Sequence, residues 1–101
     1  MRERIMYEIE NAIFLEPNTF DEAIIGIAYR FGMEPVVTYD RTLVIDILAR
    51  DMSREEAEEF FEFNTIGAWM GDLTPVFIDT SALLEWVKQQ LIQNGIEVDD
   101  E

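Results

Sequence analysis

The fold is decided by two runs, Ala23-Ile-Ile-Gly-Ile-Ala-Tyr29 and Pro35-Val-Val-Thr-Tyr39, which a short link joins. β-Branched and aromatic side chains dominate both runs, as is typical of strands. A helix is the alternative for the first run, because Thr19-Phe-Asp-Glu22 fits a capping box and Gly32 fits a C-terminal cap. The short link favours two paired strands, so we predict a β-hairpin over residues 22–39.

Helices are predicted on both sides of this hairpin. Before it, apolar residues recur at helical spacing from residue 2 to about residue 14, and Pro17 ends that helix. After it, Asp40 is suited to cap a helix that runs to Arg50. Ser53-Arg-Glu-Glu56 is a capping box for the next helix. The residues of that helix that share one inward sector are Ala57, Phe60, Phe61 and Asn64.

The C-terminal part adds a strand over residues 75–79 and a last helix that Asp79 or Thr80 caps and Asn94-Gly95 ends. We therefore predict the α+β class, with one small domain over residues 1–96. Its short, mainly antiparallel sheet is covered by about four helices, and residues 97–101 form a flexible acidic tail. The predicted inward face of the last helix consists of Leu83, Leu84, Val87 and Leu91.

Cysteine and histidine are both absent from the 101 residues. Without cysteine there is no disulfide, thiolate nucleophile or cysteine-based zinc site, and without histidine the commonest general base and metal ligand are missing. Ser53 and Ser81 stand where helix caps belong, and no histidine can activate them. We therefore predict no cofactor and no metal, and an enzyme is the less favoured class of protein.

The formal net charge is −15, from 22 acidic residues against seven basic ones. Direct binding to nucleic acid or to an anionic membrane needs clustered Lys and Arg, so we exclude both. Residues 1–54 hold ten acids and six arginines, hence −4, whereas residues 55–101 hold twelve acids and one lysine, hence −11. Such a field favours a basic protein partner. Solubility, or adaptation to a salty cytoplasm, explains the same acidity without any partner.

The densest acidic feature lies on the helix that Ser53 caps. Four glutamates point away from its predicted core side and form one outward ridge: Glu55, Glu58, Glu59 and Glu62. The ridge is about 10 Å long, with one carboxylate per ~2.6 Å, against one phosphate per ~3.4 Å on each strand of duplex DNA. Its like-charged i,i+4 pairs cost about 1 kcal/mol or less in total. A cost this small is tolerated for solubility alone, so a solvated surface is the favoured explanation of the ridge and a partner-binding site is the alternative.

A second candidate is the loop Asn64-Thr-Ile-Gly-Ala-Trp-Met-Gly-Asp-Leu-Thr-Pro75. Its glycines let the backbone approach a ligand closely, which predicts a binding loop. The favoured explanation is nevertheless structural: the glycines supply positive φ angles and the tryptophan packs into the core. The residues of this candidate are Asn64, Gly67, Trp69, Gly71 and Asp72.

Three segments of the chain together resemble a known family. They are Asp21-Glu-Ala-Ile-Ile-Gly-Ile-Ala28, Val36-Val-Thr-Tyr-Asp40 and Met52-Ser-Arg-Glu-Glu-Ala-Glu-Glu-Phe-Phe-Glu-Phe-Asn-Thr-Ile-Gly-Ala-Trp-Met-Gly-Asp-Leu-Thr-Pro-Val-Phe-Ile78. Over about residues 20–79 the chain resembles a family of short uncharacterised proteins encoded by bacteriophages and prophages. That family has no assigned activity. The resemblance implies an infected bacterial cytoplasm as the setting and implies no catalytic residue.

These observations predict a small, non-enzymatic interaction protein that docks on a basic protein partner. The N-terminus begins with charges rather than a secretory signal, so we expect a cytoplasmic location. A narrower form of the hypothesis is a nucleic-acid mimic that inhibits a host nucleic-acid-binding protein. One alternative is a structural homo-oligomer that uses an apolar surface around Trp69, Met70 or Trp86. The other is an enzyme that binds a divalent metal through Asp21, Asp40 or Asp72.

Overall fold

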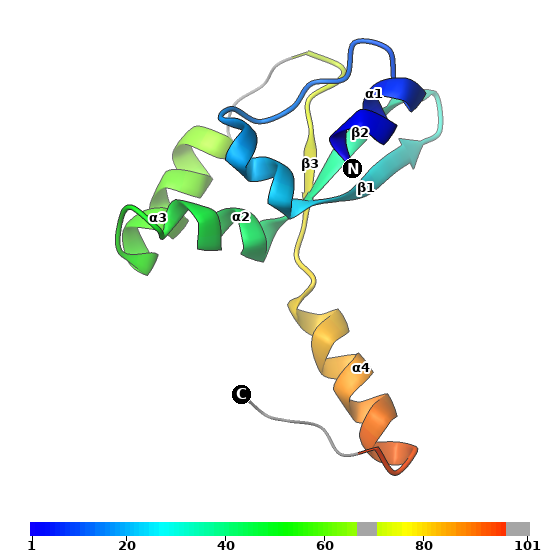
Figure 1. Cartoon of the computed structure of the whole chain (residues 1–101), viewed down its shortest axis with the longest axis vertical. Helices are drawn as coiled ribbons and strands as arrows, with labels where there is room; N and C mark the ends of the chain where they lie inside the picture. The colour runs from blue at the N-terminus through cyan, green and yellow to red at the C-terminus, as the bar shows by residue number, and fades with distance from the viewer. Residues whose placement is uncertain (67–70, 97–101) are drawn as a thin grey trace.

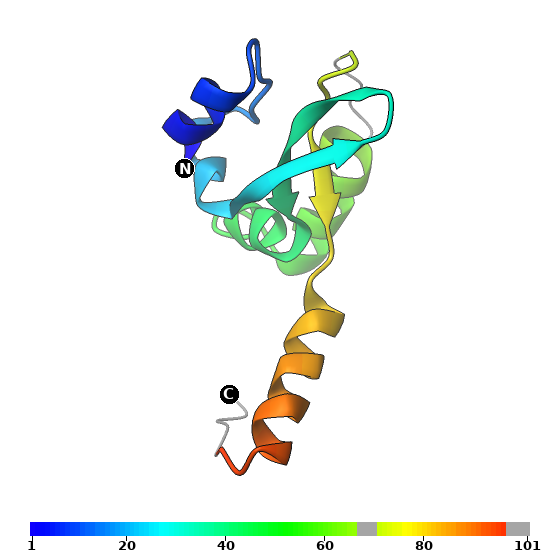
Figure 2. The same ribbon diagram turned by 90° about the vertical axis from the view of Figure 1, so that its right-hand side faces the viewer.

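The computed structural model describes residues 1–66 and 71–96, so the predicted tail at 97–101 lies outside the described residues (Figures 1 and 2). It confirms the α+β class. The sheet has the strand order β1-β2-β3, with β1 at Ile24–Arg30, β2 at Met33–Asp40 and β3 at Val76–Ile78. None of the described helices combines the length and the apolar character that a membrane span needs. The helices are α1 (Arg2–Glu8), η1 (Asn18–Ala23), α2 (Arg41–Leu48), α3 (Arg54–Phe60), η2 (Phe61–Thr65) and α4 (Ser81–Gln93).

The predicted hairpin is confirmed. Strands β1 and β2 pair antiparallel, from Ile24 opposite Tyr39 to Arg30 opposite Met33. In the turn between them Gly32 has a φ of 74°, a left-handed conformation that glycine adopts without strain. The helical alternative is realised only as the 3-10 helix η1, which stops where β1 begins. Strand pairing therefore decides the conformation of the β-branched run.

Strand β3 runs parallel to β2, with Phe77 opposite Tyr39. Parallel neighbours need a crossover connection, and α2, α3 and η2 supply it. The prediction of a mainly antiparallel sheet holds for the longer β1–β2 pairing, and β3 adds a short parallel ladder. Strand β2 is the central strand because it has a partner on each side.

The hydrophobic core lies on the face of the sheet that Val37 and Tyr39 share, since alternate residues of a strand point to the same side. Both side chains are completely buried. Helices α1, α2 and α3 and the 3-10 helix η1 pack on them, so most of the predicted helical cover is present. The buried residues that these helices contribute are Ile5, Phe20, Ala23, Val44, Ile45, Ile47, Leu48 and Ala57.

The first helix is shorter than the predicted residues 2–14, because α1 ends at Glu8. Ile9 is extended and Asn11 has a φ of 62°, so the chain leaves the helix there. Further on, the Leu15 N–H donates a hydrogen bond to Tyr39 Oη at 2.8 Å in the core. An amide that is satisfied by a side chain of the sheet has no need of a helical carbonyl. This hydrogen bond ties the non-helical segment after α1 to the sheet, and Ile9 and Leu15 of that segment are buried in the core.

The end of β2 fixes the start of two helices. Asp40 Oδ1 accepts a hydrogen bond from the Leu43 N–H at 3.2 Å, which confirms the predicted N-cap of α2. Asp40 Oδ2 accepts one from Thr80 Oγ1 at 2.7 Å, directly before α4. The residue is only 8% exposed, so both bonds are shielded from water. Helix α2 then ends at Leu48 rather than at the predicted Arg50.

Helix α4 does not cover the sheet, so the prediction of an inward-facing last helix is wrong. In both ribbon views α4 points away from the rest of the protein, and none of its residues is buried (Figures 1 and 2). This projection raises the radius of gyration to 15.8 Å, against about 13 Å for a compact chain of this length. Helical periodicity shows that a helix has an apolar face but does not say what covers that face.

The buried hydroxyl of Tyr39 should stabilise the fold, because it accepts the hydrogen bond of the Leu15 N–H. Burial raises the pKa of Tyr39 above that of an ordinary tyrosine, because the phenolate is poorly solvated in the core. Replacing Tyr39 by Phe leaves the Leu15 N–H without its partner, so we expect unfolding to become easier by about 1–3 kcal/mol at pH 7. Urea unfolding monitored by circular dichroism measures this difference.

The difference in stability between the wild type and Tyr39→Phe should depend on pH. Above pH ~10 the unfolded wild type loses the Tyr39 proton while the folded state keeps it, so wild-type stability falls. Tyr39→Phe lacks this proton, and the gap between the two proteins should narrow as the pH rises beyond that value. Tyr29→Phe, at a side chain that is 73% exposed, is the control and should change neither quantity. If the difference in unfolding free energy between wild type and Tyr39→Phe stayed constant across this pH range, the raised pKa of Tyr39 would be wrong.

Candidate functional site: an acidic groove on helix α3

Helix α3 begins at the predicted capping box. Ser53 Oγ accepts a hydrogen bond from the Glu56 N–H at 3.1 Å, and the Ser53 hydroxyl donates to Glu56 Oε1 at 3.0 Å. Glu55 and Glu56 then lie in the first turn, where negative charge complements the helix dipole. The local sequence therefore sets both the start of α3 and the direction in which its glutamates point.

The core side of α3 continues into a π-helical turn. Ala57 and Phe61 are completely buried, and the Phe61 ring packs edge-on against Phe77 with centroids 5.1 Å apart. In η2 the Ile66 N–H donates to the Phe61 carbonyl at 2.8 Å, which is the i to i+5 bond of a π turn. This wider turn carries Asn64 off the buried face, so its predicted inward position is wrong. Phe60 is also 41% exposed, because it lies at the edge of that face.

The four predicted ridge glutamates line one shallow surface groove, which we call the acidic groove. It has a volume of about 450 Å³ and is lined by Arg41, Glu55, Glu58, Glu59, Glu62 and Phe63. The structure thus brings the ridge residues together as the 3.6-residue period predicts. Arg41 from α2 and Phe63 from η2 complete the lining, and the sequence analysis missed both.

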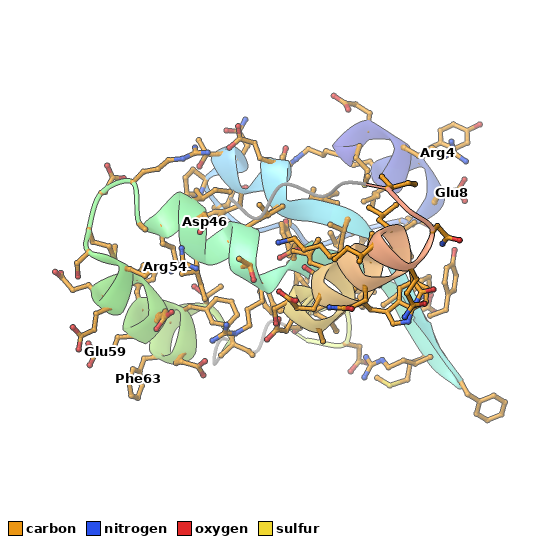
Figure 3. The ribbon with its side chains drawn as sticks, turned by 90° about the horizontal axis from the view of Figure 1, so that it is seen from below. Arg4, Glu8, Asp46, Arg54, Glu59 and Phe63 are labelled. Carbon is orange, nitrogen blue, oxygen red and sulfur yellow. The ribbon has the colours of Figure 1, made fainter. Side chains whose placement is uncertain are left out.

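Arginines pair with two of the four groove glutamates. Arg41 Nη2 lies 3.2 Å from Glu62 Oε1, and Arg54 Nε lies 3.7 Å from Glu58 Oε1. Arg54 also binds Asp46 of α2, and Figure 3 shows these two side chains close together between α2 and α3. The groove lining itself holds four carboxylates and one guanidinium group, hence a net charge of −3, and Arg54 beside it divides its charge between Glu58 and Asp46. The ridge is therefore less negative than its sequence suggests.

Glu55 and Glu59 are the groove glutamates that have no ion pair within the described part of the chain. Both are exposed and stand one helical turn apart. Phe63 lies beside them with 77% of its surface exposed. Figure 3 shows Glu59 and Phe63 projecting into solvent from the same end of the molecule. The groove therefore combines unpaired negative charge with an uncovered aromatic ring.

The residues of the predicted binding loop are not gathered at one site. Gly67 and Trp69 lie outside the described residues. Asn64 is exposed at the end of η2, whereas Asp72 lies beside the hairpin turn, near Gly32. Gly71 has a φ of 97°, which agrees with the structural explanation that this glycine supplies a positive φ angle. The loop gives no common surface for a ligand among its described members.

A second pocket, of about 310 Å³, is lined mainly by apolar side chains. Residues 14–16 and Phe20 form one wall, and Phe60, Asn64 and Thr65 form the other. Helical periodicity gives no sign of this pocket, because residues 14–16 line it from a segment that is not helical. Its polar lining groups are few, and nothing in the described residues indicates a reacting group or a bound ion there.

Asp21, Asp40 and Asp72 are the carboxylates of the hypothesis of a metal-dependent enzyme. The first two bind other residues of the protein, and Asp72 lies near the hairpin turn. Asp21 Oδ2 accepts a hydrogen bond from Arg2 Nε at 2.7 Å, which raises the pKa of Arg2. Asp40 caps α2 and holds Thr80. Across residues 1–66 and 71–96, no group of three or more carboxylates is placed to hold a metal ion. The described geometry therefore offers no support for metal-dependent chemistry.

Comparison of the chain with protein-family models, with curated proteins and with solved structures gave no match. The resemblance of residues 20–79 to short phage proteins therefore stays a prediction, as does the cytoplasmic location. No residue role comes to this chain from a relative. The acidic groove is a candidate on its geometry and charge alone.

The carboxylate geometry predicts that divalent cations do not bind specifically. A ligand that binds only the native state raises its stability, so a metal site must raise the melting temperature when it is filled. We expect Mg²⁺, Mn²⁺ and Ca²⁺ to shift the melting temperature no further than NaCl at equal ionic strength. Differential scanning calorimetry measures the shift. A rise that one of the divalent ions alone produces would restore the enzymatic alternative.

Proposed function

We propose that this protein is a non-enzymatic interaction protein whose acidic groove docks on a basic protein partner. The observation that carries the proposal is the pairing pattern inside the groove. Glu58 and Glu62 each pair with an arginine, of which Arg54 also pairs with Asp46, whereas Glu55 and Glu59 have no ion-pair partner in the described structure. A cation from another protein can bind these two carboxylates without first displacing an internal ion pair.

The exposed ring of Phe63 defines the partner further. An uncovered phenylalanine beside carboxylates suits a Lys or Arg side chain, because the aliphatic stem packs on the ring and the cation lies over its face or reaches a carboxylate. Arg41 already uses this mode inside the protein, since its guanidinium carbon lies 5.2 Å from the centroid of the Phe61 ring. The partner that fits is a basic segment with at least two cations one helical turn apart.

The ion pairs weigh against the nucleic-acid-mimic form of the hypothesis. With Glu58 and Glu62 paired, the free carboxylates stand about 6 Å apart at four residues of 1.5 Å each. Measured along the helix axis, that spacing is wider than the ~3.4 Å of duplex axis per phosphate on one DNA strand. A local basic segment is therefore a better partner for the groove than a surface built to follow a phosphate backbone. We propose an infected bacterial cell as the setting for this partner, on the resemblance of residues 20–79 to short phage proteins.

Charge reversal in the groove tests the proposal. The double variant Glu55→Lys with Glu59→Lys replaces two attractions by two repulsions, so we expect at least about a tenfold loss of affinity for the basic partner. The tagged wild type and the variant are incubated with a bacterial lysate at low and at high salt. Quantitative mass spectrometry then compares the basic proteins that each one retains.

The matched control is Glu10→Lys with Glu34→Lys, which makes the same change in net charge at two exposed glutamates away from α3. The proposal requires a set of basic proteins that bind the wild type and this control, are lost by the groove variant, and are released by high salt. Equal retention by the groove variant, or retention that salt does not weaken, contradicts it. Circular dichroism confirms that α3 still folds in both variants.

A further inference from the structure

Helix α4 exposes an apolar stripe that nothing in the described structure covers. Leu83, Leu84 and Val87 are 55%, 60% and 39% exposed, and Leu91 is half-buried. Separations of three, four and seven residues put these four side chains on one side of the helix. Leu84, Val87 and Leu91 follow the alternating three- and four-residue spacing by which paired helices meet. We call these four residues the α4 stripe.

Helix α4 is too short to be stable without packing. It has 13 residues, and isolated helices of about 12–15 residues are only marginally formed in water. Its capping is local: Asp79 Oδ1 accepts hydrogen bonds from the Ser81 N–H at 2.9 Å and from the Ser81 hydroxyl at 2.7 Å. These bonds lower the pKa of Asp79 and mark the start of the helix, but they bury no apolar surface. The remainder of α4 therefore needs a partner surface to stabilise it.

The charge of α4 indicates what kind of molecule can cover the α4 stripe. Glu85 and Lys88 are its charged residues, so residues 81–96 are neutral, whereas residues 1–80 carry −11. A basic protein gains nothing by contacting a neutral helix in place of the acidic surface. An anionic membrane repels the chain as a whole, and α4 lacks the several cations of a helix that lies on such a membrane. A second copy of α4 offers a neutral helix with the same apolar stripe, and the repulsion between the two acidic chains is weak where their bodies lie far apart.

We propose that α4 pairs antiparallel with α4 of a second copy of this chain, about a twofold axis near Val87. Leu83 and Leu91 lie four residues on either side of Val87, so a partner that runs in the opposite direction places Leu83 against Leu91. The two acidic bodies then stand at opposite ends of a helix about 20 Å long, more than two Debye lengths apart at physiological ionic strength. A parallel pair brings the bodies together. The proposal does not depend on the acidic groove.

The first test measures self-association by sedimentation equilibrium of the full chain. The double variant Leu84→Gln with Val87→Gln removes two stripe side chains per copy and keeps net charge and helix propensity, so we expect a dimer weaker by roughly a hundredfold. The matched control is Trp86→Gln with Ile92→Gln, two exposed apolar residues of α4 outside the stripe, which should dimerise as the wild type does. Equal weakening by both pairs, or a wild type that is monomeric up to about 1 mM, overturns the proposal.

Salt distinguishes this interface from the groove. Added NaCl screens the repulsion between two chains of charge −15 and should strengthen the dimer, whereas it should weaken docking of a basic protein on the groove. Failure of one proposal therefore leaves the other intact. The stripe variant should still retain the groove's basic proteins. A dimer that salt dissociates would overturn an interface made of the α4 stripe.

The absence of cysteine from the chain permits a geometric test, because any introduced cysteine is unique. Under mild oxidation Val87→Cys should form a disulfide-linked dimer, and Ile92→Cys, outside the stripe, should not. Leu83→Cys mixed with Leu91→Cys should cross-link across the two variants, although neither should cross-link alone, because like positions then lie far apart. Cross-linking of Leu83→Cys alone overturns the antiparallel arrangement.

Discussion

The carboxylate of Asp40 is the point on which the arrangement of the other elements depends. It ends the central strand, and its two oxygens accept hydrogen bonds from the Leu43 N–H and from Thr80 Oγ1. The first bond directs α2 over the core, and the second holds the segment from which α4 leaves. The neighbouring residue, Tyr39, binds the Leu15 amide and stacks on Phe77 with centroids 5.8 Å apart. Two consecutive residues of β2 thereby position most of the chain.

The elements that could be predicted from the sequence are those that local interactions determine. The hairpin follows from β-branched runs about a short link, and the Asp40 and Ser53 caps follow from side chains that bond amides three residues onward. The end of α1 at Glu8 could not be predicted, because the apolar period continues past it and the burial of Ile9 and Leu15 in the non-helical segment depends on tertiary packing. The exposure of α4 could not be predicted either, since periodicity describes the apolar face of a helix and not its neighbour.

In the acidic groove, too, some features follow from local sequence and others depend on tertiary packing. The common direction of Glu55, Glu58, Glu59 and Glu62 follows from helix geometry, and the structure shows it. The pairing of Glu62 with Arg41 spans 21 residues and depends on how α2 packs against α3. Arg54, by contrast, lies four residues before Glu58, so its pairing could have been found in the sequence as an i,i+4 ion pair. Phe63 lies four residues after Glu59, so its position beside that glutamate also follows from helix geometry.

The π turn in η2 has a consequence for how the groove can vary. A π turn accommodates one more residue than an α-helical turn, so loss of a single residue there would let α3 continue as a regular helix. In a regular α-helix one residue more or less would turn the segment after it by about 100°, whereas the wider turn absorbs the extra residue. The chain can thus gain or lose one residue at η2 while the segments on either side of it keep their mutual orientation.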